Sequence, residues 1–419
     1  MRSGGGALVA AVCTAHVLTM VGVFAFPALL PTFMVEWQLS NTEAGWIAGI
    51  YFGAYALGVP ALVALTDRID ARLIYLGGAS LAAAASAGFA LLADGFWSAA
   101  VLRALAGVAL AGTYMPGLRV LVDRYEGPHP SRAVALYTSS FSLGTAVSFL
   151  VAGEIAQAFG WRPAFAVAAI AATAAAAIVL TLRPVRRAAS QPAPHDAETP
   201  LLDHRLLDFR PVFANPPAVG YILGYGVHCW ELFTLRSWMV AFLAFSLTLQ
   251  PETPAAALSP TTIAMISGLV AMAASIIGNE LCLRFGRRRV IRLVMIASAL
   301  SAAAFGFAAG LPYAVVAGLA LAYSAVVQLD SAALTAGAVA VAAPGRQGAT
   351  MAMHSLIGFG GGFIGPLVLG WTLDMTGGAL SPLSWGLAFA TVAVVGTLGP
   401  LALTLVPGDP PAHQQRARG

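Results

Sequence analysis

The chain has 419 residues, of which 59% are hydrophobic and 10% charged, and its formal net charge at pH 7 is +4. Its mean hydropathy is +0.81. A soluble domain of this size could not cover so much apolar surface, so the composition excludes an ordinary soluble protein. The positive charge comes from arginine alone, and its distribution, described below, gives no reason to expect a nucleic-acid partner.

Twelve apolar stretches fill the chain, and each is long enough to cross a lipid bilayer. About 20 apolar residues, each rising about 1.5 Å, span the hydrocarbon core. We therefore predict an all-α membrane protein with 12 transmembrane helices around a central cavity. The stretches are residues 8–36, 42–66, 72–93, 97–123, 133–159, 163–183, 216–247, 260–283, 289–309, 311–341, 348–372 and 383–406.

The arginines lie almost entirely in the loops on one side of these stretches. Of the 22 basic residues, Arg162 is the only one that falls in a loop on the opposite side. Because loops rich in basic residues stay in the cytoplasm, we predict a multi-pass inner-membrane protein with both termini cytoplasmic. The first stretch runs well beyond the roughly 7 to 15 residues of a secretory signal, and we interpret it as a retained helix.

A polar segment divides the chain into two similar halves. Trp161-Arg162-Pro163-Ala164-Phe165 enters the sixth stretch much as Trp385-Gly386-Leu387-Ala388-Phe389 enters the twelfth, which indicates a duplicated unit. Ser40 and Ser259 open the second and eighth stretches as helix caps. We predict an N-terminal six-helix bundle over 1–183, a cytoplasmic linker over 184–215, a C-terminal six-helix bundle over 216–408 and a cytoplasmic tail over 409–419.

Every third predicted helix carries no charge in its core. A charge at the bilayer centre costs about 2.5 to 3.5 kcal/mol, so helices 3, 6, 9 and 12 are predicted to face lipid while the others enclose a wet cavity. We expect Arg119 and His354 to lie near the cytoplasmic ends and Glu154 near the external end. The embedded residues are His16, Arg103, Arg119, Glu154, His228, Glu231, Arg236, Asp330 and His354.

Two predicted cytoplasmic loops carry related motifs. The loop after helix 2 contains Asp67-Arg68 and Arg72, and the corresponding loop of the second half reads Arg284-Phe285-Gly286-Arg287-Arg288. Both resemble the Gly-x-Leu-Ala-Asp-Arg-x-Gly-Arg-Arg loop of the major facilitator superfamily, and the resemblance covers essentially the whole chain. It implies a latch that stabilises the outward-open state through charge pairs and helix dipoles. The latch residues would be Asp67, Arg68, Arg72, Arg284, Arg287 and Arg288; alternatively these arginines serve topology only.

Two further elements bear on the coupling ion. Arg103-Ala104-Leu105-Ala106-Gly107 resembles the family's helix-4 element, whose arginine is associated with proton coupling. The Gly-x-x-x-Gly-Pro element that family antiporters carry on helix 5 is absent there, and a copy stands instead at 361–366 on helix 11. This departure disfavours an antiporter.

Helix 7 carries the richest chemistry. Glu231 falls close to its midpoint, and transporters of this fold bind substrate near the bilayer midplane, so Glu231 is the first proton-carrier candidate. Asp330 is the second, unless it forms a permanent ion pair with an arginine such as Arg236. His16 and His228 are either relay groups or hydrogen-bonded core residues. Proton-coupling candidates are Glu231, Asp330 and Arg103, and substrate-binding candidates are Arg236, His228, Tyr225, Tyr114, His16 and Tyr323.

These residues define the predicted function. Arg103 and Arg236 would supply positive charge and paired donors, which suit carboxylates or other small oxyanions. We predict proton-coupled symport of a small organic anion or metabolite by alternating access, carried out by a monomer. The alternative is proton-coupled efflux of lipophilic or cationic compounds, favoured by Trp230, Phe233, Trp238 and Met351.

Other classes of protein fit less well. No nucleophile–base pair or metal cluster predicts an enzyme, and the spacing of Cys13, Cys229 and Cys282 fits neither a disulfide framework nor a zinc site, so we expect no cofactor. Internal duplication disfavours a channel. A receptor or scaffold on a transporter fold stays open, because a fold does not fix a function.

Overall fold

The computed structural model describes residues 5–185, 209–251, 258–344 and 346–407. Helices occupy all twelve predicted stretches. The first half comprises α1 (Gly5–Met20), α2 (Ala25–Ala28), α3 (Leu30–Glu36), α4 (Asn41–Leu65), α5 (Ala71–Leu92), α6 (Phe96–Arg124), α7 (Pro130–Phe159) and α8 (Trp161–Leu180). The second comprises α9 (Arg210–Phe213), α10 (Pro216–Thr248), α11 (Pro260–Phe285), α12 (Arg287–Gly306), α13 (Tyr313–Gln328), α14 (Ser331–Val341), α15 (Gln347–Thr376), α16 (Pro382–Gly396), α17 (Leu398–Ala402) and η2 (Leu403–Leu405).

Both predicted serine caps are present. The Ser40 hydroxyl accepts from the backbone N–H of Glu43, whose carboxylate accepts in turn from the backbone of Ser40, which completes a capping box at the start of α4. The Ser259 hydroxyl accepts from the backbone N–H of Thr262 at the start of α11. These hydrogen bonds satisfy donors that helix geometry leaves free and fix where the second and eighth helices begin.

Ten of the helical segments in the described part of the chain are long and apolar enough to cross a membrane. The two remaining predicted spans are the first, which is broken into α1, α2 and α3, and the seventh, which is α10. Polar residues along α10, including Glu231 and Arg236, lower its hydropathy. The tenth span is also interrupted, at Leu329–Asp330 between α13 and α14.

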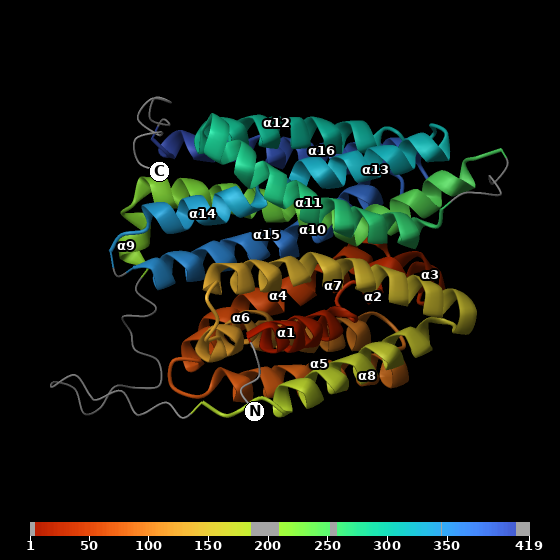
Figure 1. The fold of residues 1–419 in the computed structure, drawn as a ribbon. Helices are drawn as coiled ribbons and strands as arrows, with labels where there is room; N and C mark the ends of the chain where they lie inside the picture. The colour runs from red at the N-terminus through yellow and green to blue at the C-terminus, as the bar shows by residue number, and fades with distance from the viewer. Residues whose placement is uncertain (1–4, 186–208, 252–257, 345, 408–419) are drawn as a thin grey trace.

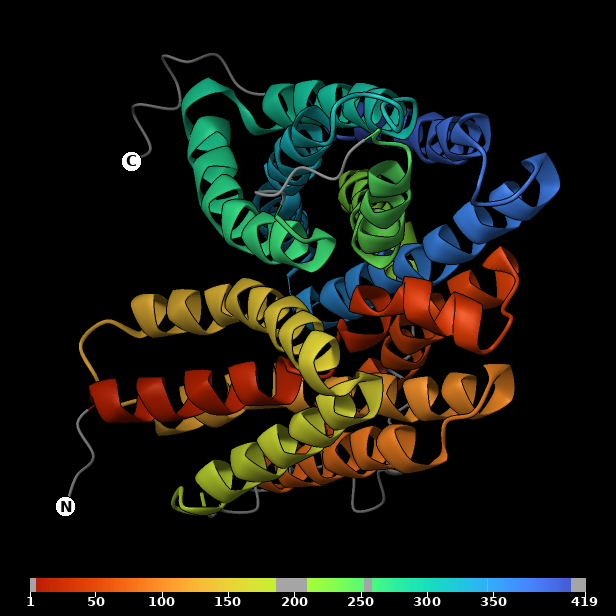
Figure 2. The same cartoon turned by 90° about the vertical axis from the view of Figure 1, so that its right-hand side faces the viewer.

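The helices form two groups that lie side by side (Figures 1 and 2). Helices α1–α8 pack on one another, and so do α10–α16. The outer edges of the molecule are formed by α5 and α8 in one group and by α12 and α16 in the other, as the spacing of polar residues predicts. Their outward side chains are apolar and well exposed, for example Leu92, Ile170, Leu300 and Val394.

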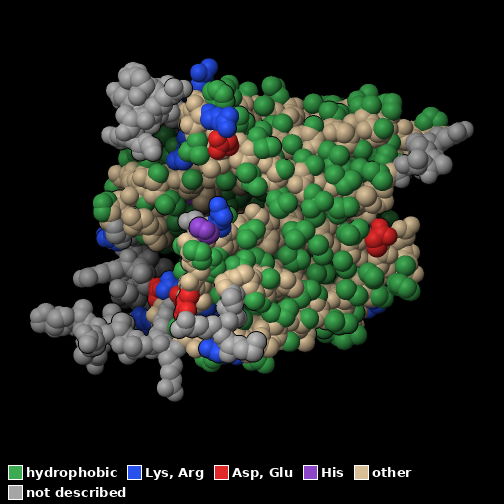
Figure 3. Space-filling view, in the orientation of Figure 1, with side chains coloured by type: hydrophobic (Ala, Val, Ile, Leu, Met, Phe, Trp, Pro, Cys, Tyr) green, Lys and Arg blue, Asp and Glu red, His purple; other side chains and the backbone are tan. Residues whose placement is uncertain are grey.

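The exposed flank seen in Figure 3 is mostly hydrophobic, with charged side chains gathered toward one end. This arginine-rich end carries Asp67, Arg72, Arg124 and Arg284. The predicted domain boundaries stay a prediction, because most of the linker 184–215 and all but the first residues after 406 lie outside the described residues.

Contacts between the two groups run mainly through α4 with α15 and α7 with α11. Glycines allow α4 and α15 to approach closely: a Cβ at Gly45 would overlap the carbonyl of Pro366, and one at Gly49 would overlap that of Phe363. At mid-length the ring of Phe52 on α4 lies 4.0 Å, between centroids, from that of Phe233 on α10. The helix groups are therefore closed against each other at the end remote from the arginines.

Candidate functional site

A cavity of about 950 Å³ lies between the two helix groups. Its walls come from α6 and α7 on one side and from α10, α11, α13, α14 and α15 on the other. It reaches from buried Phe233 and Arg236 to Glu280 and Arg284, whose side chains are 55% and 67% exposed. The cavity is therefore open toward the arginine-rich end, where Figure 3 shows a hollow between the groups.

At the closed end of the molecule, a carboxylate connects the two helix groups. Asp374, near the end of α15, accepts hydrogen bonds from the backbone N–H groups of Asn41 and Thr42 at 3.1 and 2.8 Å, and from both of their side chains. Asn41 and Thr42 are the first residues of α4, where free N–H groups and the helix dipole favour a negative charge. Asp374 thus joins the two helix groups across their closed end.

Helix α10 supplies the central part of the wall. Its cavity-lining residues recur every three or four positions, so they form one stripe along the helix. Of the predicted substrate-binding residues, Arg236, His228 and Tyr225 lie on this stripe, and Tyr114 lies on the opposite wall. The stripe consists of Tyr225, His228, Cys229, Leu232, Phe233 and Arg236.

Arg236 is 5% exposed and is one of the residues that line the cavity. Its Nη2 donates a long hydrogen bond of 3.5 Å to the side-chain oxygen of Gln328, and its Cζ lies 5.7 Å from the ring centroid of Phe24. No carboxylate among the residues that the structure describes lies within ion-pair distance of Arg236. The predicted alternative, in which Asp330 pairs with Arg236, is therefore wrong in this structure.

Asp330 contacts His228 instead. Its Oδ1 lies 2.7 Å from His228 Nδ1, and both side chains are almost fully buried. Asp330 precedes the first residue of α14, at the interruption of the tenth span. His228 also stacks on Tyr225, whose ring stacks in turn on His354 at 3.8 Å between centroids. The predicted second proton candidate thus reaches the cavity through a histidine on its wall.

Glu231, the first proton candidate, points away from the cavity. Its Oε1 accepts a 2.6 Å hydrogen bond from the Ser298 hydroxyl of α12, and the hydroxyl of Tyr323 lies beside the same carboxylate. A Cβ at Gly396 of α16 would lie 3.8 Å from Glu231 Oε2. Glu231 and Tyr323 are thus embedded within the second helix group, so the interpretation of Tyr323 as a cavity residue is not supported by its position.

His16 and Arg103 also lie outside the cavity wall. His16 Nδ1 lies 2.7 Å from the Ser140 hydroxyl, and its ring stacks on Tyr114 and on Tyr137. Arg103 Nη1 donates to the carbonyl of Val23 at 3.0 Å, in the break between α1 and α2, and its guanidinium lies over the ring of Tyr51. The positive charge predicted for the cavity is thus carried by Arg236 and not by Arg103.

The ion pairs that the described residues Asp67 and Arg284 form each stay within one helix group. Asp67 lies 3.7 Å from Arg119, which also pairs with Asp123, and Arg284 pairs with Glu280 on its own helix. Every ion pair resolved between described residues connects two members of the same group. Arg68 lies exposed after α4, and Arg287 and Arg288 open α12. Arg119 lies near this end of its helix, as expected, with its side chain 42% exposed beside Asp67.

The arginine-rich end also holds a tighter cluster of hydrogen-bonded charged residues, which the loop motif did not predict. Arg124 Nη2 donates to both carboxylate oxygens of Asp70, at 2.8 and 2.7 Å. Asp70 also accepts from the backbone N–H groups of Arg72 and Val185, and Arg72 donates to the carbonyl of Val179 at the end of α8. Partial burial alone would raise the pKa of Asp70, but these hydrogen bonds outweigh it and hold the pKa below its usual value.

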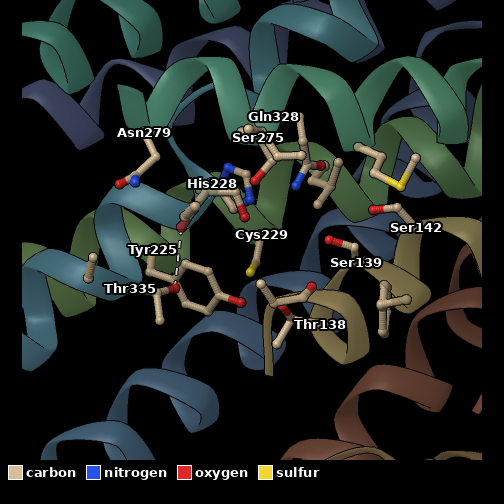
Figure 4. A pocket seen from close by; sticks show the side chains of 18 of the residues that line it. Thr138, Ser139, Ser142, Tyr225, His228, Cys229, Ser275, Asn279, Gln328 and Thr335 are labelled. Carbon is tan, nitrogen blue, oxygen red and sulfur yellow. Dashed lines mark hydrogen bonds between the residues drawn. The ribbon is translucent and has the colours of Figure 1, made fainter. Parts of the chain in front are cut away.

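Two further polar residues of the cavity were not predicted (Figure 4). His354 lies about two turns into α15, near the expected end, but it is 2% exposed, lines the cavity and lies 3.2 Å from the Thr335 hydroxyl. Gln328 is the acceptor for Arg236. An uncharged amide two positions before a membrane-embedded acid is a signal that could have marked it. The remaining polar wall residues are Thr138, Ser139, Ser142, Ser275, Asn279, Ser331 and Ser355.

Comparison with known proteins identifies the family of this chain. Residues 12–253, more than half of the chain, match the family model described as Major Facilitator Superfamily. A 152-residue segment is 30% identical to the niacin transporter NiaP of Acinetobacter baylyi, covering 36% of this chain and 34% of that protein. Protein spinster homolog 1 of Bos taurus is 22% identical over 323 residues, 74% of this chain and 61% of its own length.

The chain therefore matches less than two thirds of either relative's length. A solved structure of a bacterial homologue of the lysosomal transporter spinster, titled as inward-facing and unoccupied, superposes with a TM-score of 0.71. It is 16% identical in sequence and covers 96% of this chain and 95% of its own, which establishes the shared fold. The chain belongs to the Major Facilitator Superfamily, a family of membrane transporters and not of enzymes.

Proposed function

We propose that this transporter moves a small organic anion together with protons, by alternating access of its two helix groups. The observation that carries the proposal is Arg236: a buried guanidinium in the cavity wall with no carboxylate partner among the described residues. A guanidinium stays charged at any pH near neutrality, and burying its charge is costly unless an anion compensates it. An anionic substrate would supply that compensation.

The surroundings of Arg236 favour an anion that carries a ring. Tyr225, Phe233 and Phe359 line the same cavity, and aromatic faces pack well against a planar ligand. The guanidinium can bind a carboxylate through two parallel hydrogen bonds. The similarity to niacin transporters, though it spans about a third of the chain, points to the same chemistry. Aromatic monocarboxylates such as nicotinate are therefore the first compounds to test.

Asp330 and His228 are the proposed proton site. A carboxylate and an imidazole 2.7 Å apart can share or release a proton as their exposure changes, and His228 is part of the cavity wall. The predicted first candidate, Glu231, is separated from the cavity by α10 itself, so we place it second. Arg103, bound to the break between α1 and α2, is proposed as a structural residue.

The orientation completes the proposal. By the arginine distribution, the arginine-rich end faces the cytoplasm. We further propose that the chain resides in the inner membrane as a monomer. The cavity described here is then open to the cytoplasm, and Asp374 closes the external end.

Binding of matched ligand pairs to the purified protein tests the anion. Nicotinate and benzoate differ from nicotinamide and benzamide essentially by one charge, so titration calorimetry separates charge from shape. We expect the acids to bind and the amides to bind at least about tenfold more weakly. Arg236→Gln should abolish the difference. Arg284→Gln, which removes an exposed arginine at the mouth of the same cavity, should preserve it.

The runner-up function is efflux of lipophilic cations, which the methionines in the cavity wall favour. Met115, Met272 and Met351 provide adaptable apolar surface of the kind that promiscuous sites use. The same titration includes tetraphenylphosphonium as a probe. Binding of this cation without binding of the acids would overturn the anion proposal and support efflux.

A further inference from the structure

The interruption of the tenth span places two neighbouring side chains against two different residues of α10. Gln328 is the last residue of α13 and contacts Arg236, whereas Asp330 precedes α14 and contacts His228. Arg236 and His228 stand eight positions apart, about 12 Å along the helix. The break therefore lets two residues that are only two positions apart in the sequence contact partners that lie about two turns apart on α10.

Packing against α11 fixes where this break lies. A Cβ at Gly278 would overlap the carbonyl oxygen of Leu329, the residue between Gln328 and Asp330. Only a glycine allows the backbone of the break to approach α11 so closely. The position of Gln328 relative to Arg236 is thus set by the backbone, and does not depend on a flexible surface loop.

Asp330 and Gln328 differ in charge, and this difference bears on which substrates the cavity can bind. A carboxylate beside His228 can neutralise that imidazole when it is protonated. The amide of Gln328 accepts a hydrogen bond from Arg236 but brings no charge, so it orients the guanidinium and leaves the positive charge uncompensated. A glutamate has nearly the same size and shape as glutamine. At this position it would compensate Arg236 permanently.

We propose that Gln328 is a specificity-determining residue: its neutral amide holds Arg236 in place while keeping the cavity selective for anions. This inference rests on the proposed function, because it presumes that Arg236 binds the anionic group of the substrate. It adds that the choice between anionic and neutral substrates is made by one residue on α13, outside the helix that carries the arginine.

A charge exchange at this position tests the proposal. In Gln328→Glu, the new carboxylate should pair with Arg236, and the affinity for nicotinate should fall about 10- to 100-fold while that for nicotinamide is unchanged or rises. The thermal unfolding temperature should not fall, because the buried arginine gains a partner. In Gln328→Met, which removes the acceptor without adding charge, preference for the acid should remain.

Asn279→Asp is the matched control. Asn279 is another uncharged amide of the cavity wall, and it lies on the far side of His228 from Gln328 in Figure 4. The Asn279→Asp substitution adds the same charge to the same cavity but away from Arg236. The affinity for nicotinate should therefore fall much less than in Gln328→Glu. An equal fall in Asn279→Asp and Gln328→Glu would overturn the specific role of Gln328 and indicate a general effect of cavity charge.

The outcomes separate this inference from the function it rests on. If the unmodified protein does not distinguish nicotinate from nicotinamide, or benzoate from benzamide, the proposed anion site is wrong. If it prefers the acids and Gln328→Glu keeps that preference in a protein with unchanged thermal stability, the anion site stands and Gln328 does not determine its specificity.

Discussion

At the residue scale, the cavity residues of α10 could be identified from helical periodicity, but their functions could not. Tyr225, His228 and Arg236 share one face at about 100° per residue, and all three line the cavity. Glu231 falls about 130° from the centre of that face. Glu231 was the first proton candidate because it lies near the middle of the helix. That position does not determine which way its side chain points. Which face of α10 meets the cavity depends on how the second helix group packs.

The position of Asp330 gives a first prediction. Asp330→Asn keeps the shape of the side chain beside His228 but removes the carboxylate that could carry a proton. We expect exchange of labelled nicotinate across proteoliposome membranes to persist, and accumulation driven by a proton gradient to fall at least about tenfold.

Glu231→Gln is the comparison, since it removes an acid that lies outside the cavity wall. Proton-driven accumulation should survive this change to within a few-fold. Loss of accumulation in Glu231→Gln with retention in Asp330→Asn would restore Glu231 as the proton carrier.

A second prediction concerns stability and pH. Asp70 stabilises the folded chain through hydrogen bonds to Arg124 and two backbone N–H groups, and its folded-state pKa is depressed. This stabilisation is present above the unfolded-state pKa of about 3.9 and disappears as the pH falls through the lower folded-state value. Asp70→Asn should therefore cost about 1 to 3 kcal/mol near pH 7.

Thermal unfolding in detergent from pH 7 down to pH 3 measures this effect. The gap between the unmodified protein and Asp70→Asn should be constant near neutral pH and shrink below about pH 4. Asp67→Asn, an exposed acid in the same turn, should change stability by less than about 0.5 kcal/mol. A gap that widens on acidification contradicts the assigned role of Asp70.

At the element scale, hydropathy located the twelve predicted spans, but it located neither the short helix α9 in the predicted linker nor the breaks within the spans. The α1–α2 break contains Gly22, and the α13–α14 break contains neither glycine nor proline. Both breaks are held by contact with other helices. The Ser148 hydroxyl accepts from Phe24 N and donates to the Val21 carbonyl, so it satisfies backbone groups that the first break leaves free. At the second break, Gly278 has no side chain and so leaves room for the carbonyl of Leu329. Such partners are distant in sequence.

A third prediction concerns the contact between α4 and α15. Asp374→Ala removes the carboxylate that holds the first residues of α4, so the closed end should open more often. The natural thiol of Cys229, a cavity residue, reports this opening in a variant whose Cys13 and Cys282 are replaced by serine. An impermeant maleimide added at the external side should label Cys229 several-fold faster in Asp374→Ala.

Glu154→Ala serves as the control for this labelling, because Glu154 is an exposed acid on α7 whose removal leaves the α4–α15 contact intact. Equal labelling rates in all three proteins would show that Asp374 does not hold the external end closed.

At the scale of the whole molecule, the duplicated pattern and the loop motifs were enough to identify the family, whereas the conformation was not predictable. The latch implied by the family motif belongs to the outward-open state, and in this cavity-open arrangement its described ion pairs stay within each group. A sequence specifies both states, so the motif alone does not indicate which pairs are formed in one of them.

Alternating access gives a fourth prediction. Ala135 on α7 and Ile277 on α11 line opposite walls of the open cavity. Cysteines at these positions, joined by a rigid bifunctional maleimide in a variant lacking the native cysteines, should hold the cavity open. We expect nicotinate binding to persist and transport to stop. Transport at the uncrosslinked rate would contradict movement of the two groups, and a pair within one wall, at Met115 and Thr138, controls for modification itself.

The central claim is that binding of an anion at Arg236 is coupled to proton movement. The most direct test is proton flux into proteoliposomes on addition of nicotinate, with an internal pH indicator and no other gradient. We predict inward proton flux that depends on nicotinate, is absent with nicotinamide, and is lost in Arg236→Gln. Labelled nicotinate uptake without proton movement, or equal proton flux with the amide, would contradict the account.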